Sequence, residues 1–155
     1  MSDLTSRTIP VLDEAERSQI AKEMKEVLAS LRFLADERLA VHQISHKQGV
    51  PLRYLDRRST CNVTELATAA GTDLGAMTRM LERLEAKGFL ERRRSSTDRR
   101  VVYVSLLEAG ATIAAVVDDV LVRVTEAHLK DFTLQERAQL CEFLERMRAN
   151  GRALV

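Results

Sequence analysis

Basic side chains gather in one short stretch of this 155-residue chain, from Arg79 to Arg100. The stretch holds eight Lys or Arg residues against four Asp or Glu residues, which gives it a net charge of +4. The whole chain carries only +1, so the remainder sums to −3. Guanidinium groups pair well with phosphate oxygens, and a localised basic patch is typical of a surface that binds nucleic acid. A solvated run of charges without a partner is the alternative.

The residues around this basic stretch predict a β-hairpin. Gly88 is expected to end a helix, and the segment beyond the basic tip alternates apolar and polar residues like a half-buried strand, in Val102, Val104 and Leu106. Five arginines of the hairpin are candidates for phosphate contacts: Arg92, Arg93, Arg94, Arg99 and Arg100. One acid, Asp98, would repel DNA at this place. We expect it to hold the Arg100 side chain in a bidentate pair and so to shape the tip.

Two short helices are predicted directly before the hairpin. The first covers about residues 62–70 and is closed by Gly71 as a left-handed cap. The second covers residues 73–87, with Thr72 or Asp73 as its N-cap. Its inner face is expected to hold Leu74, Met77, Leu81 and Leu84. Helix, glycine turn, helix and hairpin together make a winged helix-turn-helix, which places its second helix in the major groove of DNA.

The second helix of this unit carries outward residues that suit the reading of bases. Gly75 and Ala76 are small, so the start of the helix can approach base edges closely. Thr78 and Arg79 supply hydrogen-bond donors for bases or phosphates. A solvated amphipathic helix is the alternative for this segment taken alone.

Long amphipathic helices are predicted on both sides of this unit. The first covers about residues 12–44 and is expected to end at Gly49 and Pro51, with Pro51 opening a short helix. Two more are expected over residues 107–129 and 133–151. A helix of about 30 residues exceeds the roughly 8–20 typical of globular proteins, so we expect the apolar stripes of these helices to pack in a symmetric dimer.

The expected fold is therefore mainly α with a small β-hairpin wing, in one compact domain with three parts. Residues 1–48 form an N-terminal extension and dimerisation helix, and the first ten residues are expected to be disordered or loosely docked. Residues 49–106 form the winged helix-turn-helix DNA-binding unit. Residues 107–155 form the C-terminal dimerisation helices.

Composition narrows the classes of function. Aromatic residues make up 4% of the chain and Trp is absent, which argues against recognition by stacking on single strands or RNA loops. No Gly-rich phosphate loop, nucleophile motif or recognisable pair of acids points to an enzyme, and we expect no cofactor. Isolated cysteines, with no long apolar run and no signal-peptide core, predict a cytoplasmic protein without a membrane partner. A winged helix that docks on other proteins is a better alternative to a DNA-binding protein than an enzyme is.

Residues 63–110 resemble the MarR family of bacterial transcription regulators. The resemblance rests on ELA before the turn, TR in the second helix, LE-KG followed by two apolar residues, D-R-R in the wing and the final L-x-EAG. Leu107 departs from the pattern, because the family commonly has Thr there. The resemblance implies a homodimer that binds a pseudopalindromic operator in double-stranded DNA, usually as a repressor. In many members a small aromatic or phenolic ligand releases the DNA.

By position, the resemblance implies three sets of functional residues. The major-groove set is Thr72, Asp73, Gly75, Ala76, Thr78 and Arg79. The wing contacts are Arg94, Ser95, Ser96, Arg99 and Arg100, with Asp98 as the structural partner of the wing. The polar residues expected near a ligand cleft between the first two helices, the DNA unit and the fifth helix are Arg38, His42, His46, Tyr54 and Arg58. Cationic and imidazole groups there would suit a carboxylate or phenolate.

Two other sensing sites are open from the sequence. His42 and His46 lie four residues apart, a spacing that puts two metal ligands on one helix face, but no Cys or third His clusters visibly with them. We therefore expect no metal site. Cys61 lies near Arg57 and Arg58, which could lower the pKa of its thiol and make it a redox sensor. Burial as a small apolar side chain is the interpretation we favour, both for Cys61 and for Cys141 on the apolar stripe of its helix.

Overall fold

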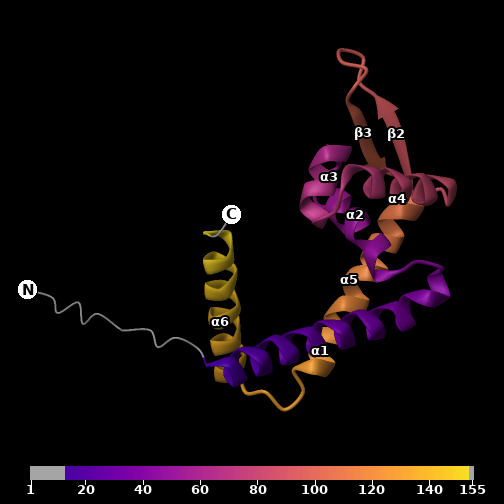
Figure 1. Ribbon diagram of the computed structural model, residues 1–155. Helices are drawn as coiled ribbons and strands as arrows, with labels where there is room; N and C mark the ends of the chain where they lie inside the picture. Colours follow the sequence, from indigo (N-terminus) through magenta and orange to yellow (C-terminus); the bar gives the residue numbers. More distant parts are fainter. Residues whose placement is uncertain (1–12, 154–155) are drawn as a thin grey trace, which may run out of the picture.

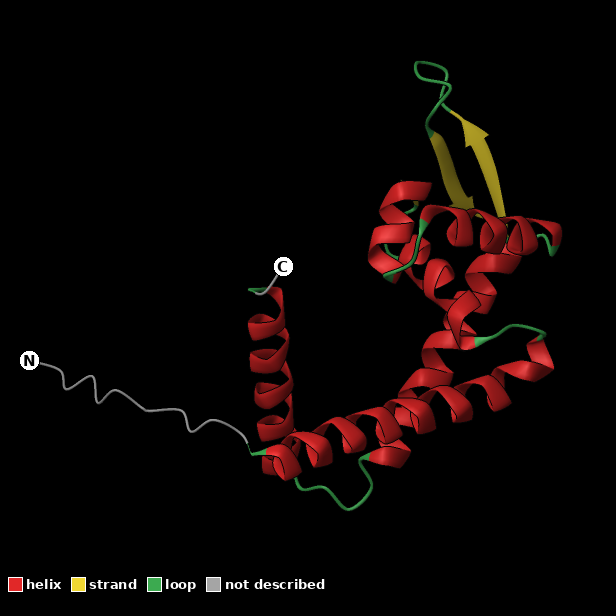
Figure 2. Ribbon diagram, in the orientation of Figure 1, coloured by secondary structure: helices red, strands yellow, loops and turns green. Residues whose placement is uncertain are grey.

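The computed structural model describes residues 13–153, and the expectation of a loosely docked segment at residues 1–10 lies outside them. The elements follow in the order α1 (Glu14–Leu39), η1 (Ala40–His42), α2 (His46–Asp56), β1 (Thr60–Asn62), α3 (Val63–Ala70), α4 (Leu74–Ala86), β2 (Leu90–Arg94), β3 (Val102–Leu106), α5 (Glu108–His128) and α6 (Leu134–Arg152). The β2–β3 hairpin projects from one end of the molecule, above α3 and α4, and α6 stands well apart from this unit (Figures 1 and 2).

The first two helices meet at Gln43, whose backbone is left-handed with φ of 58°. Ser45 then opens α2 through a capping box in which its side chain and that of Gln48 satisfy each other's backbone N–H groups. Gly49 and Pro51 lie inside α2, so the prediction that they end the first helix was wrong. A Cβ on Gly49 would come within 2.6 Å of Val117, which explains a glycine inside a helix that packs on α5.

The helix-turn-helix forms where the sequence predicts it. Asn62 caps α3 in a capping box with Glu65, and Gly71 ends it in the left-handed conformation, with φ of 60°. The Asp73 carboxylate accepts a hydrogen bond from the backbone N–H of Ala76 at 2.8 Å and so opens α4. One inner residue was predicted wrongly: the Leu74 side chain is 52% exposed, because it lies in the first turn of α4, outside the core.

The sheet has three antiparallel strands in the order β1-β3-β2, one more than the predicted hairpin. Val104, at the centre of β3, lies opposite Cys61 on one side and Arg92 on the other. A three-residue strand is too short to show the alternation from which strands are predicted. The pairing of β1 with β3 ties the root of the wing to the segment that opens α3.

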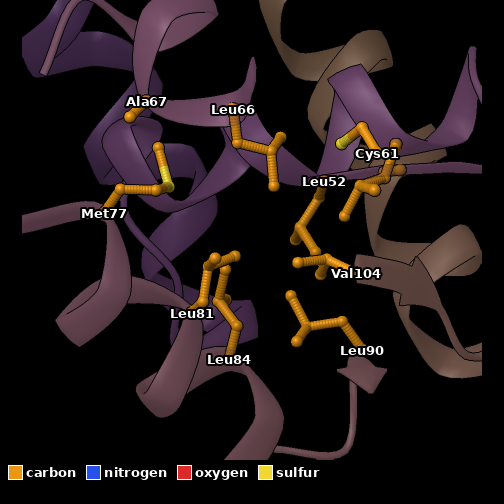
Figure 3. Close-up of a cluster of buried hydrophobic side chains, with 11 residues drawn as sticks. Leu52, Cys61, Leu66, Ala67, Met77, Leu81, Leu84, Leu90 and Val104 are labelled. Carbon is orange, nitrogen blue, oxygen red and sulfur yellow. The ribbon is translucent and has the colours of Figure 1, made fainter. Parts of the chain in front are cut away.

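The hydrophobic core of the winged unit is built from one to three residues of each contributing element (Figure 3). Leu66 of α3, Met77 and Leu81 of α4, and Val104 of β3 are all at most 1% exposed, and Leu52 of α2 belongs to the same cluster. These contacts fix α4 relative to the wing. The two candidate DNA-binding elements therefore form one rigid unit.

A second core cluster joins α1 to α5, through Ala35, Leu39, Val117 and Val124. No residue of α6 is buried. Among residues 13–153, no helix is both long and apolar enough to cross a membrane.

The start of α5 is fastened to the root of the wing. Leu107 is its N-cap without a side-chain hydrogen bond, as the missing Thr leads one to expect. The backbone N–H of Leu107 instead donates to the carbonyl of Phe89 at 3.0 Å. A Cβ on Gly110 would lie 1.8 Å from the same carbonyl oxygen, so only glycine permits this approach.

Candidate nucleic-acid interface

The exposed side of the α4 N-terminus gathers the residues expected to read bases. Gly75 and Arg79 are exposed, and Ala76 is half-buried. The Thr78 hydroxyl donates to the carbonyl of Leu74 at 2.7 Å, which leaves its lone pairs available as acceptors. Asp73 is the N-cap of α4, so its carboxylate is already occupied by a backbone N–H of the helix. The face is therefore small, polar and cationic.

The wing tip is a tight loop held by its own polar groups. Ser95 Oγ accepts hydrogen bonds from the backbone N–H groups of Thr97 and Asp98, each at 3.2 Å. The Asp98 carboxylate accepts from the backbone N–H of Arg100 at 2.9 Å. The expected bidentate pair between the Asp98 and Arg100 side chains is not formed, so Asp98 orders the backbone of the tip and leaves the Arg100 guanidinium free.

The hairpin arginines fall into two groups. Arg92 is paired with Glu85 at 2.7 Å and with Glu82 at 3.6 Å, both on α4, and Arg93 pairs with Glu91 at 3.0 Å. The expectation that these two contact phosphates therefore conflicts with the structure, because carboxylates of the chain already occupy them. The described residues show no ion pair for Arg94, Arg99 or Arg100.

The residues expected at a ligand cleft are not brought together. A cavity of about 1000 Å³ lies between α1, α2, α5 and the start of α6, and of the five expected residues only His46 lines it. Tyr54 and Arg58 lie together in a separate pocket of about 290 Å³, joined by a hydrogen bond of 2.5 Å. Arg38 and His42 line neither cavity.

The large cavity holds cations that the sequence prediction missed. Arg53 and Arg57, one helical turn apart on α2, both pair with Asp118 of α5, Arg57 at 3.8 Å. Arg32 and Arg137 add two more guanidinium groups to the lining. The four-residue spacing of Arg53 and Arg57 on one helix face was the sequence feature that could have pointed to them.

Neither alternative sensing site is supported. His42 lies in η1 and His46 in α2, with the left-handed Gln43 between them, so they do not share a helix face. Among the described residues no three His, Cys, Asp or Glu side chains form a metal site. Burial, together with the charge of Glu65, raises the pKa of the Cys61 thiol to about 11, and Arg58 offsets only part of this. A redox-active thiolate at Cys61 is thereby contradicted.

Comparison with known proteins matches this geometry. The MarR family model matches residues 44–102, from the end of the α1–α2 connection into the wing. The HTH-type transcriptional regulator YwhA of Bacillus subtilis is 30% identical over 98 residues, which cover 63% of this chain and 70% of YwhA. The multiple antibiotic resistance protein MarR of Escherichia coli is 49% identical over 49 residues, 32% of this chain and 34% of MarR.

The solved structures extend the similarity beyond the winged unit. A mutant of MarR from Escherichia coli, crystallised in complex with operator DNA, superposes with a TM-score of 0.77 at 28% identity and covers 88% of this chain and 99% of its own. A MarR transcriptional regulator from Methanosarcina mazei, at 22% identity and a TM-score of 0.81, shares the fold. The relatives are regulators and not enzymes. This chain belongs to the MarR family of HTH-type transcriptional regulators.

Proposed function

We propose that two copies of this chain form a homodimeric repressor that binds a pseudopalindromic operator. In each copy the start of α4 reads a major groove and the wing holds the adjacent backbone and minor groove. The proposed base-reading residues are Thr72, Asp73, Gly75, Ala76, Thr78 and Arg79, and the proposed wing contacts are Arg94, Ser95, Ser96, Arg99 and Arg100. The observation that carries the proposal is the set of wing arginines that form no ion pair within residues 13–153 and lie beside α4 on one rigid core.

Exposed apolar side chains support the dimer. Met24 and Leu28 of α1 and Phe143 and Leu144 of α6 are between 43% and 53% exposed, and α6 buries no residue within its own chain. A helix in a protein gains most of its stability from the packing of its apolar face, so α6 needs a partner surface. A second copy supplies one with twofold symmetry, which suits the symmetry of a palindromic site. The three-part division of the chain into residues 1–48, 49–106 and 107–155 belongs to the same proposal.

Selection from a random duplex library tests the DNA proposal without knowledge of the operator. We expect enrichment of an inverted repeat whose half-sites are centred about 10 base pairs apart, one helical turn. On the selected sequence, Arg100→Ala should weaken binding and lower the slope of log K against log salt by about 0.9 for each lost phosphate contact. Arg93→Ala is the matched control, because it removes an equal charge that Glu91 already neutralises.

Failure to enrich any sequence at moderate salt would overturn the DNA proposal and favour a protein-docking module. An unchanged salt slope in Arg100→Ala would overturn the role of the wing tip alone.

Release by a small aromatic or phenolic acid is the second part of the proposal. The cavity between α1, α2 and α5 supports it, because its volume suits a ligand of that size and its arginines suit a carboxylate. An anion there would compete with Asp118 for Arg53 and Arg57, which tie α2 to α5. Binding would thus alter the helix packing that sets the position of the DNA unit.

A further inference from the structure

A second cationic groove lies along the flank of α4 that faces away from the wing. The groove has a volume of about 530 Å³ and is lined by residues of α1, the start of α2, the turn before α4, and α4 itself. Five of its lining residues are basic: Arg32, His46, Lys47, Arg79 and Arg83. None of its lining residues is acidic. On the wing side of α4, by contrast, Arg92 lies against Glu82 and Glu85.

The permanent cations of this groove form no ion pair with any residue that the structure describes. Within residues 13–153, Arg32, Lys47, Arg79 and Arg83 form no ion pair, and all four are exposed. Asp36, whose carboxylate accepts the backbone N–H of His46 at 2.6 Å, forms no ion pair with these cations within residues 13–153. Like charges gathered without counter-charges repel each other, and an anion bound among them removes that cost.

His46 adds little positive charge to the groove. Its pKa is lowered chiefly by burial, and the nearby Arg32 and Arg53 act in the same direction against Asp36. The groove therefore relies on its four permanent cations, on α1, α2 and α4. Their spread over three elements suits a repeating array of phosphates better than one small carboxylate.

The groove is continuous with the face proposed to read bases. Thr72, Ala76 and Arg79 belong to both, and Arg83 follows Arg79 one helical turn later, about 6 Å along the axis. A duplex that receives the start of α4 in its major groove carries a phosphate backbone along each flank of the helix. The wing accounts for one flank only.

We propose that this groove is a second phosphate clamp, in which Lys47 and Arg83, supported by Arg32, hold the DNA backbone on the flank of α4 opposite the wing. The inference rests on the proposed function and adds a contact from the N-terminus of α2 to it. Such contacts position the protein on the duplex without reading its sequence. A clamp on either side would fix the angle at which α4 enters the groove.

A salt titration with a random-sequence duplex tests the clamp, since phosphate contacts need no operator. Fluorescence anisotropy would compare the unmodified protein, the double variant Lys47→Ala/Arg83→Ala and the control Lys130→Ala/Arg152→Ala. The control removes the same charge from exposed residues outside the winged unit. We expect the slope of log K against log salt to fall by about 1.8 per bound protomer in the double variant and to stay unchanged in the control.

The charge-conserving variant Lys47→Arg/Arg83→Lys should restore the slope, and circular dichroism melting should show all variants folded. A double variant that binds with the slope of the unmodified protein would overturn the clamp. A change equal to that of the control would also overturn it, because net charge alone would then explain the loss. Absence of salt-dependent binding by the unmodified protein would instead contradict the proposed function itself.

Discussion

Arg92 and Arg94 lie two residues apart in β2, yet their guanidinium groups have different surroundings. Arg92 is covered by Glu82 and Glu85 and joins the wing to α4. Arg94 is exposed, with no acid paired to it in the described chain. An arginine paired with two carboxylates of its own chain stabilises the fold, whereas one without such a pair is available to a phosphate. Counting arginines in the sequence cannot separate the two roles.

Cys61 should be unreactive in the folded protein. With a pKa of about 11, about one thiol in a thousand is ionised near pH 8, against about one in four for an ordinary cysteine. Iodoacetamide should therefore modify Cys61 in the Cys141→Ser variant about 100-fold more slowly when folded than in denaturant, as followed by mass spectrometry. Equal rates in the two states would contradict the burial that the structure gives this thiol.

At the scale of the elements, the sequence predicts best where local chemistry decides the structure. Asn62, Gly71 and Asp73 act on backbone groups a few residues away, so the bounds of α3 and α4 were confirmed closely. The end of the first helix was missed because Gln43 adopts a positive φ that its residue type does not announce. Gly49 was wrongly predicted to end a helix, because the residue that requires a glycine there is Val117, which lies 68 positions later in the sequence.

The residues of the candidate site were also predictable only where they lie close together in the sequence. Residues of α4 and the wing were predictable because they lie near each other in the sequence. The cations of the large cavity come from α1, α2 and α6, and only the packing of these helices shows that Arg32, Arg53 and Arg137 share one space. The paired state of Arg92 depends on Glu85, seven positions earlier, across a turn whose geometry the pattern does not give.

Variants of two neighbouring arginines test whether the large cavity between α1, α2 and α5 binds a ligand. A small aromatic acid should lower the DNA affinity of the protein, and Arg57→Ala should weaken that effect about tenfold, because one charge-assisted pair is worth roughly 1.5–3 kcal/mol. Arg58→Ala is the matched control, since Arg58 lies against the Tyr54 ring and does not line the large cavity. Calorimetry and anisotropy measure both effects. A panel of such acids with no effect on DNA affinity would remove the ligand from the proposal.

At the scale of the whole molecule, the apolar side of α6 should decide the oligomeric state. Phe143→Glu places a charge among exposed apolar residues, and light scattering after gel filtration should show a shift from dimer to monomer, with loss of operator affinity. Ala149→Glu, on the opposite face of the same helix, is the control and should stay dimeric. A dimer that survives Phe143→Glu would mean that α6 has another partner.

The close contact of Gly110 with the carbonyl of Phe89 fixes the start of α5 to the root of the wing, so the two move together. The 21 residues of α5 extend about 30 Å from the hairpin root toward the core shared with α1. A tilt of about 10° at the α1 end therefore moves the wing by about 5 Å, a large fraction of the width of a DNA groove. Because Leu107 alone separates β3 from α5, the angle of this helix would determine where the wing lies against DNA.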